Sequence, residues 1–281
     1  MHILLLVLIV LLVWAIRFFL RPRQAHEALF PFLFPPLVIF FTLLSIIAMG
    51  RNGEMFGLPS GFFAYLLSLS LLLIIFLVSV QKFWQMNEDL KKIRQLPLEK
   101  IANSQVRMID IDFPYIAQIG FWSPELVMSK GLVYLLEPEE LTAVLAHEKA
   151  HYIFRDTFCF FVLDLIRSLT CWLPYTQMLW QKLILMREIR ADRWALRVSD
   201  PLILTQSLLK IIGAVSQTSK KIEFSDSFSA PFHPDMSNSH LLIRIDSILE
   251  KDEAYPSLLS TLFLGVLLSL LPLLLIIWHS A

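Results

Sequence analysis

Charged residues and cysteines are scarce in this chain of 281 residues, and both shortages narrow what it can be. Asp, Glu, Lys and Arg make up only 17% of the residues, and their formal net charge is zero. A net charge of zero gives no indication of nucleic-acid binding, so we expect no direct binding of nucleic acid. The two cysteines, Cys159 and Cys171, form neither a paired metal-ligand motif nor a disulfide framework, which indicates buried or membrane-facing thiols.

Long apolar runs fill the chain instead. Apolar residues make up 56% of the sequence, and four runs approach the roughly 20 residues that a helix needs to cross a bilayer. These runs are residues 3–20, 29–49, 62–80 and 258–278. The second and fourth runs contain prolines, which membrane helices tolerate better than soluble helices do. The sequence therefore predicts an integral membrane protein with four transmembrane helices.

The basic residues near these runs predict an orientation. Arg21 and Arg23 lie between the first two runs, and four basic residues closely follow the third, whereas the loop between the second and third carries only Arg51. Lys and Arg collect on the cytoplasmic side of membrane helices. We therefore predict that both termini lie outside and that residues 81–257 form a cytoplasmic domain. The first run has no basic residue before it and no small-residue cleavage site after it, so it does not resemble a signal peptide.

Within residues 81–257, two segments have the character of strands. Val106–Ile119 predicts a strand or hairpin that is interrupted by Pro114, and Phe121–Met128 predicts a second short strand. Residues 158–186 are almost as apolar as a membrane span but contain two charges and a proline. They fit two helices packed in the domain or lying against the membrane, and alternatively a re-entrant hairpin or an extra pair of spans.

A helix that we predict from Pro138 to about Arg155 contains the sequence His147-Glu148-Lys149-Ala150-His151. The His-Glu-x-x-His spacing places both imidazoles one turn apart on one helix face, as needed to bind a single Zn²⁺. Glu148 lies beside the first ligand, where a carboxylate can take a proton from a zinc-bound water. The motif therefore predicts peptide-bond hydrolysis with one Zn²⁺ per chain.

A zinc peptidase needs a third protein ligand. One zincin class has a histidine at the position of Thr157, so that class is excluded. Our candidate is Glu188, on a later helix, with Asp192 one turn further on the same face. A carboxylate at Asp192 can accept the free N–H of a ligating histidine. The alternative is that both acidic residues lie on a solvated helix face, because arginines surround them.

Three further residues are weaker candidates. His233, His240 or Arg244 could approach the substrate carbonyl and stabilise the oxyanion that forms during hydrolysis. The alternative is loop histidines and a structural arginine. We also expect Phe121–Met128 to present an unpaired strand edge to the substrate backbone.

These motifs resemble a known family. His147–His151 followed by Arg155-Asp156, and then the segment Arg187–Asp192, resemble the BlaR/MecR-type integral-membrane zinc metallopeptidases, which are antirepressors. The HtpX and CAAX-prenyl-protease group is a more distant relative. The resemblance implies a mainly α membrane protein with an α+β, gluzincin-like metalloprotease domain between the third and fourth spans. It further implies that His147, His151 and Glu188 bind zinc, that Glu148 is the general base and that Asp192 supports a ligand.

The resemblance also implies a location and a substrate. It indicates a bacterial inner or plasma membrane and a cytoplasmic protein substrate, either a BlaI-like transcriptional repressor or the chain itself. The sequence ends at Ala281, shortly after the fourth run, so we expect no C-terminal penicillin-binding sensor domain. Two alternatives are an HtpX-like protease for membrane-protein quality control, and a non-proteolytic signal transducer with structural zinc or none. The second fits less well, because Glu148 has no evident role in a closed zinc site.

Overall fold

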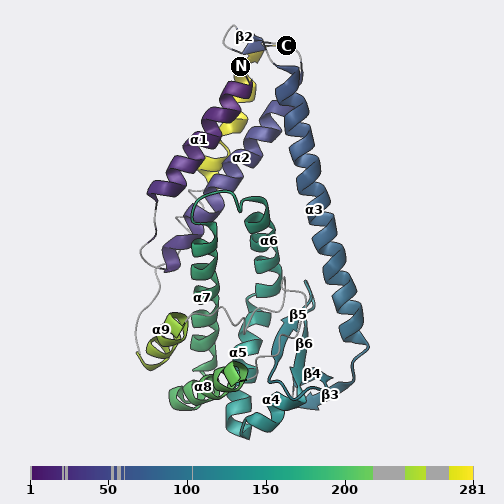
Figure 1. Ribbon diagram of the computed structural model, residues 1–281, viewed down its shortest axis with the longest axis vertical. Coiled ribbons are helices and arrows are strands. Elements are labelled where there is room, and N and C mark those ends of the chain that lie inside the picture. Colours follow the sequence, from purple (N-terminus) through teal and green to yellow (C-terminus); the bar gives the residue numbers. More distant parts are fainter. Residues whose placement is uncertain are drawn as a thin grey trace. The chain divides into compact units, whose positions relative to one another are not determined.

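A computed structural model of the chain describes residues 2–20, 22, 25–51, 54–55, 58–59, 61–102, 104–217, 238–250 and 266–280 (Figure 1). Helices dominate these residues and accompany two small sheets, which confirms the prediction of a mainly helical chain. The chain forms two compact units. The first comprises Met1–Gln81, Leu165–Ile184 and Tyr255–Ala281, and the second comprises Lys82–Asp164 and Leu185–Ala254. The cytoplasmic domain that we predicted at 81–257 stays a prediction.

The first unit contains the apolar helices. Its elements are α1 (His2–Phe19), η1 (Ala25–Ala28), α2 (Leu29–Met49), β1 (Glu54–Met55), β2 (Leu58–Pro59), the first part of α3 (Phe62–Arg94), the end of α6 (Asp156–Leu169), the start of α7 (Thr176–Ala195), η2 (Leu271–Trp278) and β7 (His279–Ser280). The three short strands form a sheet in the order β2-β1-β7. Both α1 and η2 pack against α2, and the Ser45 hydroxyl of α2 donates to the carbonyl of Pro272 in η2 (2.8 Å).

By length and composition, α2 and α3 can each cross a membrane. The 33 residues of α3 include both the predicted span 62–80 and the polar segment after it, because no Gly or Pro separates them. In the fourth predicted span, residues 258–265 lie outside the described residues, and 271–278 form a 3₁₀-helix rather than the expected α-helix. Pro272 has no N–H to donate to an α-helical bond there. The arrangement of four spans stays a prediction.

A buried arginine completes the backbone hydrogen bonding of α2. Arg17 of α1 is 1% exposed and donates from Nε to the carbonyl of Pro31 (2.9 Å) and from Nη2 to that of Phe32 (3.1 Å). These are the two carbonyls that Pro35 and Pro36, four residues later, cannot bond, because proline has no N–H. Arg17 Nη1 also donates to the hydroxyl of Thr176, the first residue of α7 (Thr176–Ala195) (2.5 Å). Arg17 thus joins three helical segments within the first unit.

The second unit is built around a four-stranded sheet. Its strands are β3 (Leu98–Ile101), β4 (Ser104–Ile109), β5 (Ile116–Ile119) and β6 (Glu125–Ser129). Its helices are α4 (Lys130–Leu135), α5 (Pro138–Ile153), α8 (Pro201–Gln217), α9 (Asn238–Leu249), the first part of α6 (Asp156–Leu169) and the second part of α7. The strand order is β3-β4-β6-β5, in which β4 and β6 are parallel and the other neighbours antiparallel.

This strand order corrects two of our expectations. Val106–Ile119 contains two strands, β4 and β5, but they do not pair as a hairpin, because β6 lies between them. The predicted edge strand, Phe121–Met128, becomes β6, which is central, so the edge next to α5 is β5. Gly131 permits the crossover: a Cβ there would lie 2.1 Å from the carbonyl oxygen of Asp112, in the connection between β4 and β5.

The core of the second unit holds α5 against the sheet. Val106, Ile116 and Met128 of the strands pack against Leu141 and Leu145 of α5. The helix begins at Pro138, as predicted. Its first turn is fixed by a capping box, in which the backbone N–H of Glu137 donates to the Glu140 carboxylate (2.9 Å) while the Glu137 side chain accepts from the backbone of Glu140. The sheet and the cap together fix the position of the residues at the other end of α5.

The Arg17 contacts predict a stability effect that depends on the prolines. Arg17→Met removes the donors and leaves two buried carbonyls unpaired, which we expect to cost about 2–4 kcal/mol of unfolding free energy. In a Pro35→Ala/Pro36→Ala background those carbonyls regain helical partners, so the same change should cost much less. Thermal unfolding of the four purified proteins in detergent measures this cycle. Equal losses in both backgrounds would contradict the assignment.

Candidate metal centre

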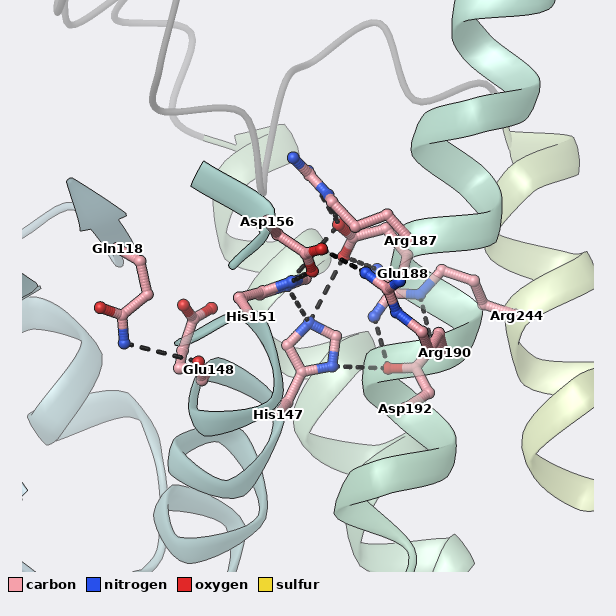
Figure 2. A network of polar contacts seen from close by, with 10 residues as sticks. All are labelled: Gln118, His147, Glu148, His151, Asp156, Arg187, Glu188, Arg190, Asp192 and Arg244. Carbon is pink, nitrogen blue, oxygen red and sulfur yellow. Dashed lines mark hydrogen bonds and ion pairs between the residues drawn. The ribbon is translucent and has the colours of Figure 1, made fainter. Parts of the chain in front are cut away.

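The two histidines of the motif are buried and face one another. His147 and His151 lie one turn apart on α5, and their Nε2 atoms are separated by 3.2 Å (Figure 2). Glu188 approaches from α7, with one carboxylate oxygen 3.4 Å from Nε2 of His147 and the other 3.8 Å from Nε2 of His151. Ligand atoms of these three residues all lie within 4.8 Å of one another. The structure therefore brings together the three residues predicted as ligands.

These distances fit a tetrahedral metal ion. Donors that each lie about 2.05 Å from a tetrahedral metal are about 3.3 Å apart, close to two of the three separations observed. A carboxylate also lies next to Nδ1 of each ring: Asp192 at 2.8 Å from His147, and Asp156 at 2.8 Å from His151. When Nδ1–H donates to a carboxylate, Nε2 of the neutral ring carries a lone pair. Two lone pairs that face each other suit a shared cation.

The position of Asp156 depends on a sharp turn after α5. The helix ends at Ile153, Arg155 has a positive φ of 56°, and α6 begins at Asp156. The left-handed conformation reverses the chain, so Asp156 returns to the His151 ring five residues earlier. No role was predicted for Asp156. The available signal was an acidic residue shortly after the helix that carries the two histidines of the motif.

A layer of arginines lies behind the carboxylates. Arg244 of α9 is 1% exposed and donates from Nε and Nη2 to the two oxygens of Asp192 (2.8 and 2.7 Å). Arg190 donates to Asp156, and Arg187 lies 2.9 Å from Glu188. Each of these three acidic residues thus has an arginine partner.

This layer decides two of the alternatives that the sequence left open. Glu188 and Asp192 are each 1% exposed, so they do not lie on a solvated helix face. Arg244 is engaged by Asp192 and also lies 3.4 Å from Glu188, which fits a structural arginine better than an oxyanion ligand. His240 lies on α9, and no described contact joins it to the cluster. His233 lies outside the described residues.

Electrostatics separate the acidic residues into two kinds. Burial acts to raise the pKa of Glu188 and Asp192, but the nearby arginines and His147 outweigh it and lower the pKa of both. Burial raises the pKa of Glu148, only partly opposed by the two histidines. Among the described residues, neither carboxylate oxygen of Glu148 has a hydrogen-bond partner. Glu188 and Asp192 are therefore stable anions, whereas Glu148 is suited to accept a proton.

The surroundings of His147 favour positive charge. Burial acts to lower the pKa of His147, but hydrogen bonds to Asp192 and Glu188 and their charges outweigh it and raise that pKa to about 9. A position that stabilises a proton so strongly also stabilises a metal cation, which binds the neutral ring in place of the proton.

The edge strand also contributes to the site. Gln118 of β5 points towards the helix that carries the motif, and its Nε2 donates to the backbone carbonyl of Glu148 (3.4 Å) (Figure 2). Its Oε1 is buried and has no hydrogen-bond partner among the described residues. Gln118 was not predicted, because nothing in its local sequence pattern distinguishes it from any other polar residue on a strand.

Comparison with known families places the cluster in a recognised type of domain. Residues 117–230 match the model of peptidase family M48. The match supports a metallopeptidase of that family and contains α5, Asp156 and α7, although it covers less than half of the chain. Arg244 lies beyond it. No curated protein matches the chain.

The carboxylate behind His151 predicts a metal-affinity effect. Asp156→Asn removes the charge that fixes the ring, so we expect zinc to bind about 10–100-fold more weakly. Competition with a chromophoric chelator measures the affinity without requiring activity. Asp110→Asn is the matched control, because Asp110 is exposed and forms an ion pair with Lys130 away from the cluster. Unchanged affinity in Asp156→Asn would refute the role.

Proposed function

We propose that the chain is a membrane-anchored zinc metalloendopeptidase that hydrolyses peptide bonds of a cytoplasmic protein. The observation that carries the proposal is the cluster of His147, His151 and Glu188 beside a buried, unpaired Glu148. Its occurrence in a segment that matches peptidase family M48 supports the same reaction.

The donor set favours catalytic zinc over structural zinc. Two imidazole nitrogens and one carboxylate are the ligands of a common catalytic zinc site, whereas structural sites are closed by four protein ligands. Among the described residues, only these three form such a group. When bound, one zinc ion would lower the pKa of a coordinated water and polarise the carbonyl of the scissile bond.

Glu148 performs the proton transfers in this proposal. Its carboxylate takes a proton from the attacking water and delivers it to the leaving amine. The raised pKa suits this role, because a weakly acidic carboxyl holds the proton between the two steps. Asp192 and Asp156 hold His147 and His151 in the tautomer that directs Nε2 at the metal.

The edge of the sheet supplies a path for the substrate backbone. Among the described strands, β5 pairs only with β6, so its other edge is available to an extended peptide. Because β5 packs against α5 and Gln118 reaches the carbonyl of Glu148, a peptide added there would pass close to the cluster. This proposal moves the role that we expected of Phe121–Met128 to Ile116–Ile119.

The membrane part of the proposal depends on the apolar helices and the basic residues. The lengths and apolar composition of α2 and α3 support anchoring, and the distribution of Lys and Arg supports termini outside and the metal centre on the cytoplasmic side. By resemblance, we propose a regulatory substrate, namely a BlaI-like repressor or the chain itself.

A change of one atom in the general base tests the reaction. Glu148→Gln keeps the size of the side chain but removes the base, so we expect a loss of cleavage of about 10²–10⁴-fold while zinc stays bound. The measurement uses a proteome-derived peptide library, with new N-termini identified by mass spectrometry and zinc by metal analysis.

The control for this experiment lies on the same helix. Glu139→Gln changes an exposed residue in the first turn of α5 and should cleave like the unaltered protein. Cleavage at full rate by Glu148→Gln would rule out the assigned base. A closed site with a fourth protein ligand would rule out catalytic zinc.

A further inference from the structure

Large aromatic side chains are exposed near the end of α5. Trp122 is 69% exposed, Trp84 64% and Tyr152 43%, and Phe83 and Phe158 are exposed beside them. We call these five residues, all in the second unit, the aromatic patch. Large apolar side chains that are exposed as a group indicate an interaction surface, whereas single exposed apolar residues are ordinary.

Ring contacts hold three members of the patch, Phe83, Trp122 and Phe158, in place. Phe83 of α3 stacks on Phe121 (5.2 Å between ring centroids), which in turn meets the edge of Phe161 on α6 (4.5 Å). Trp122, the next residue, packs edge-to-face against Phe158 (5.5 Å). The turn that contains Trp122 is therefore held between α3 and α6, and Trp122 is presented outward.

Arg155 places a positive charge within the patch. Its guanidinium donates to the carbonyl of Trp122 and lies 5.3 Å from the centroid of the Tyr152 ring. Arg155 adopts a positive φ of 56°, a conformation that costs a non-glycine residue roughly 1–2 kcal/mol. Glycine usually occupies such a position after a helix. The arginine side chain is thus placed here against the backbone preference.

The patch follows directly after the apolar run of α3. Phe83 and Trp84 continue the same helix, so Trp84 lies about 6 Å along the axis beyond Val80, where the run ends. Only 11% of the residues in an apolar 18-residue stretch of α3 are buried, which leaves the others for contact with lipid. Where such a helix leaves the hydrocarbon, Trp and Tyr are enriched, and basic side chains reach the headgroups.

We propose that the aromatic patch and Arg155 lie in the headgroup layer of the bilayer and fix the end of α5 there. This inference rests on the membrane span of α3 in the proposed function. Tyr152 directly follows the ligand His151, so the metal centre would lie close to the membrane surface. The substrates would then be chain segments that emerge from, or lie along, the bilayer, rather than parts of a protein that must stay distant from it.

A depth measurement tests the patch without using activity. The protein carries Glu148→Gln, with Cys159→Ser and Cys171→Ser, and one new cysteine labelled with a fluorophore, in phosphatidylcholine nanodiscs. Ser123→Cys places the label beside Trp122 on an exposed residue, and Tyr134→Cys, 81% exposed on α4, is the matched control. Quenchers are nitroxides attached to the lipid headgroup or deep in the acyl chain, and aqueous iodide.

We expect the headgroup nitroxide to quench the label at 123 strongly and the label at 134 weakly, with iodide showing the reverse order. Adding Trp84→Ser and Trp122→Ser should remove most of the headgroup quenching at 123. If label 123 behaves like label 134, the inference is overturned. If Trp122→Ser, made separately in the protein that keeps Glu148, raises KM for a soluble peptide while headgroup quenching at 123 stays weak, the patch binds substrate, which also overturns the inference.

A third label separates this inference from the proposed span. Ser70→Cys lies on an exposed position within the apolar run of α3, and the deep nitroxide should quench it. Strong quenching at 70 with no headgroup quenching at 123 overturns the patch alone. If the deep nitroxide does not quench the label at 70, the membrane span of α3 is wrong, and the inference about the patch fails with it. The proposed peptidase reaction is then still tested by the Glu148→Gln experiment.

Discussion

Neutralising buried carboxylates is the constraint on which the metal centre depends. Glu148, Asp156, Glu188 and Asp192 are all at most 3% exposed, and unpaired buried charges are costly. Arginines pair with three of them, and these arginines together with the two histidines lower the pKa of those three. Glu148, which has no arginine contact among the described residues, has a raised pKa. The same arrangement stabilises the buried charges and divides the carboxyls into two kinds, three with a lowered pKa and one with a raised pKa, which is the pattern expected where acidic residues have different roles.

This constraint also explains why four helices meet at the site. Helix α5 carries the histidines and the base, and α7 carries Glu188 together with two of the arginines. Asp156 comes from the start of α6, and Arg244 from α9. None of these helices alone can balance the charges that it buries. The metal centre therefore depends on the packing of the second unit, whose core holds α5 against the sheet.

The parts of the site that sequence could predict are local in the chain. One helical turn separates His147 from His151 and Glu188 from Asp192, so spacing alone places each pair on one face. The roles of Asp156 and Arg244 were not predictable in this way. Asp156 reaches His151 only because Arg155 adopts a positive φ, and Arg244 binds a carboxylate 52 residues earlier. The strand order was likewise not predictable, because it involves the close approach of the Asp112 backbone to Gly131, which no strand pattern encodes.

Arginine has a common role at these unpredicted contacts. Arg244 neutralises buried charge, Arg17 bonds carbonyls that two prolines leave unpaired, and Arg155 bonds a carbonyl in an exposed turn. The first two uses need several fixed donors on one side chain that stays charged, which lysine does not offer. A sequence that is poor in charge thus uses its arginines where the backbone or the buried acids demand a partner. Because those partners are distant in sequence, counting arginines as markers of topology or solvated surface misses what they bind.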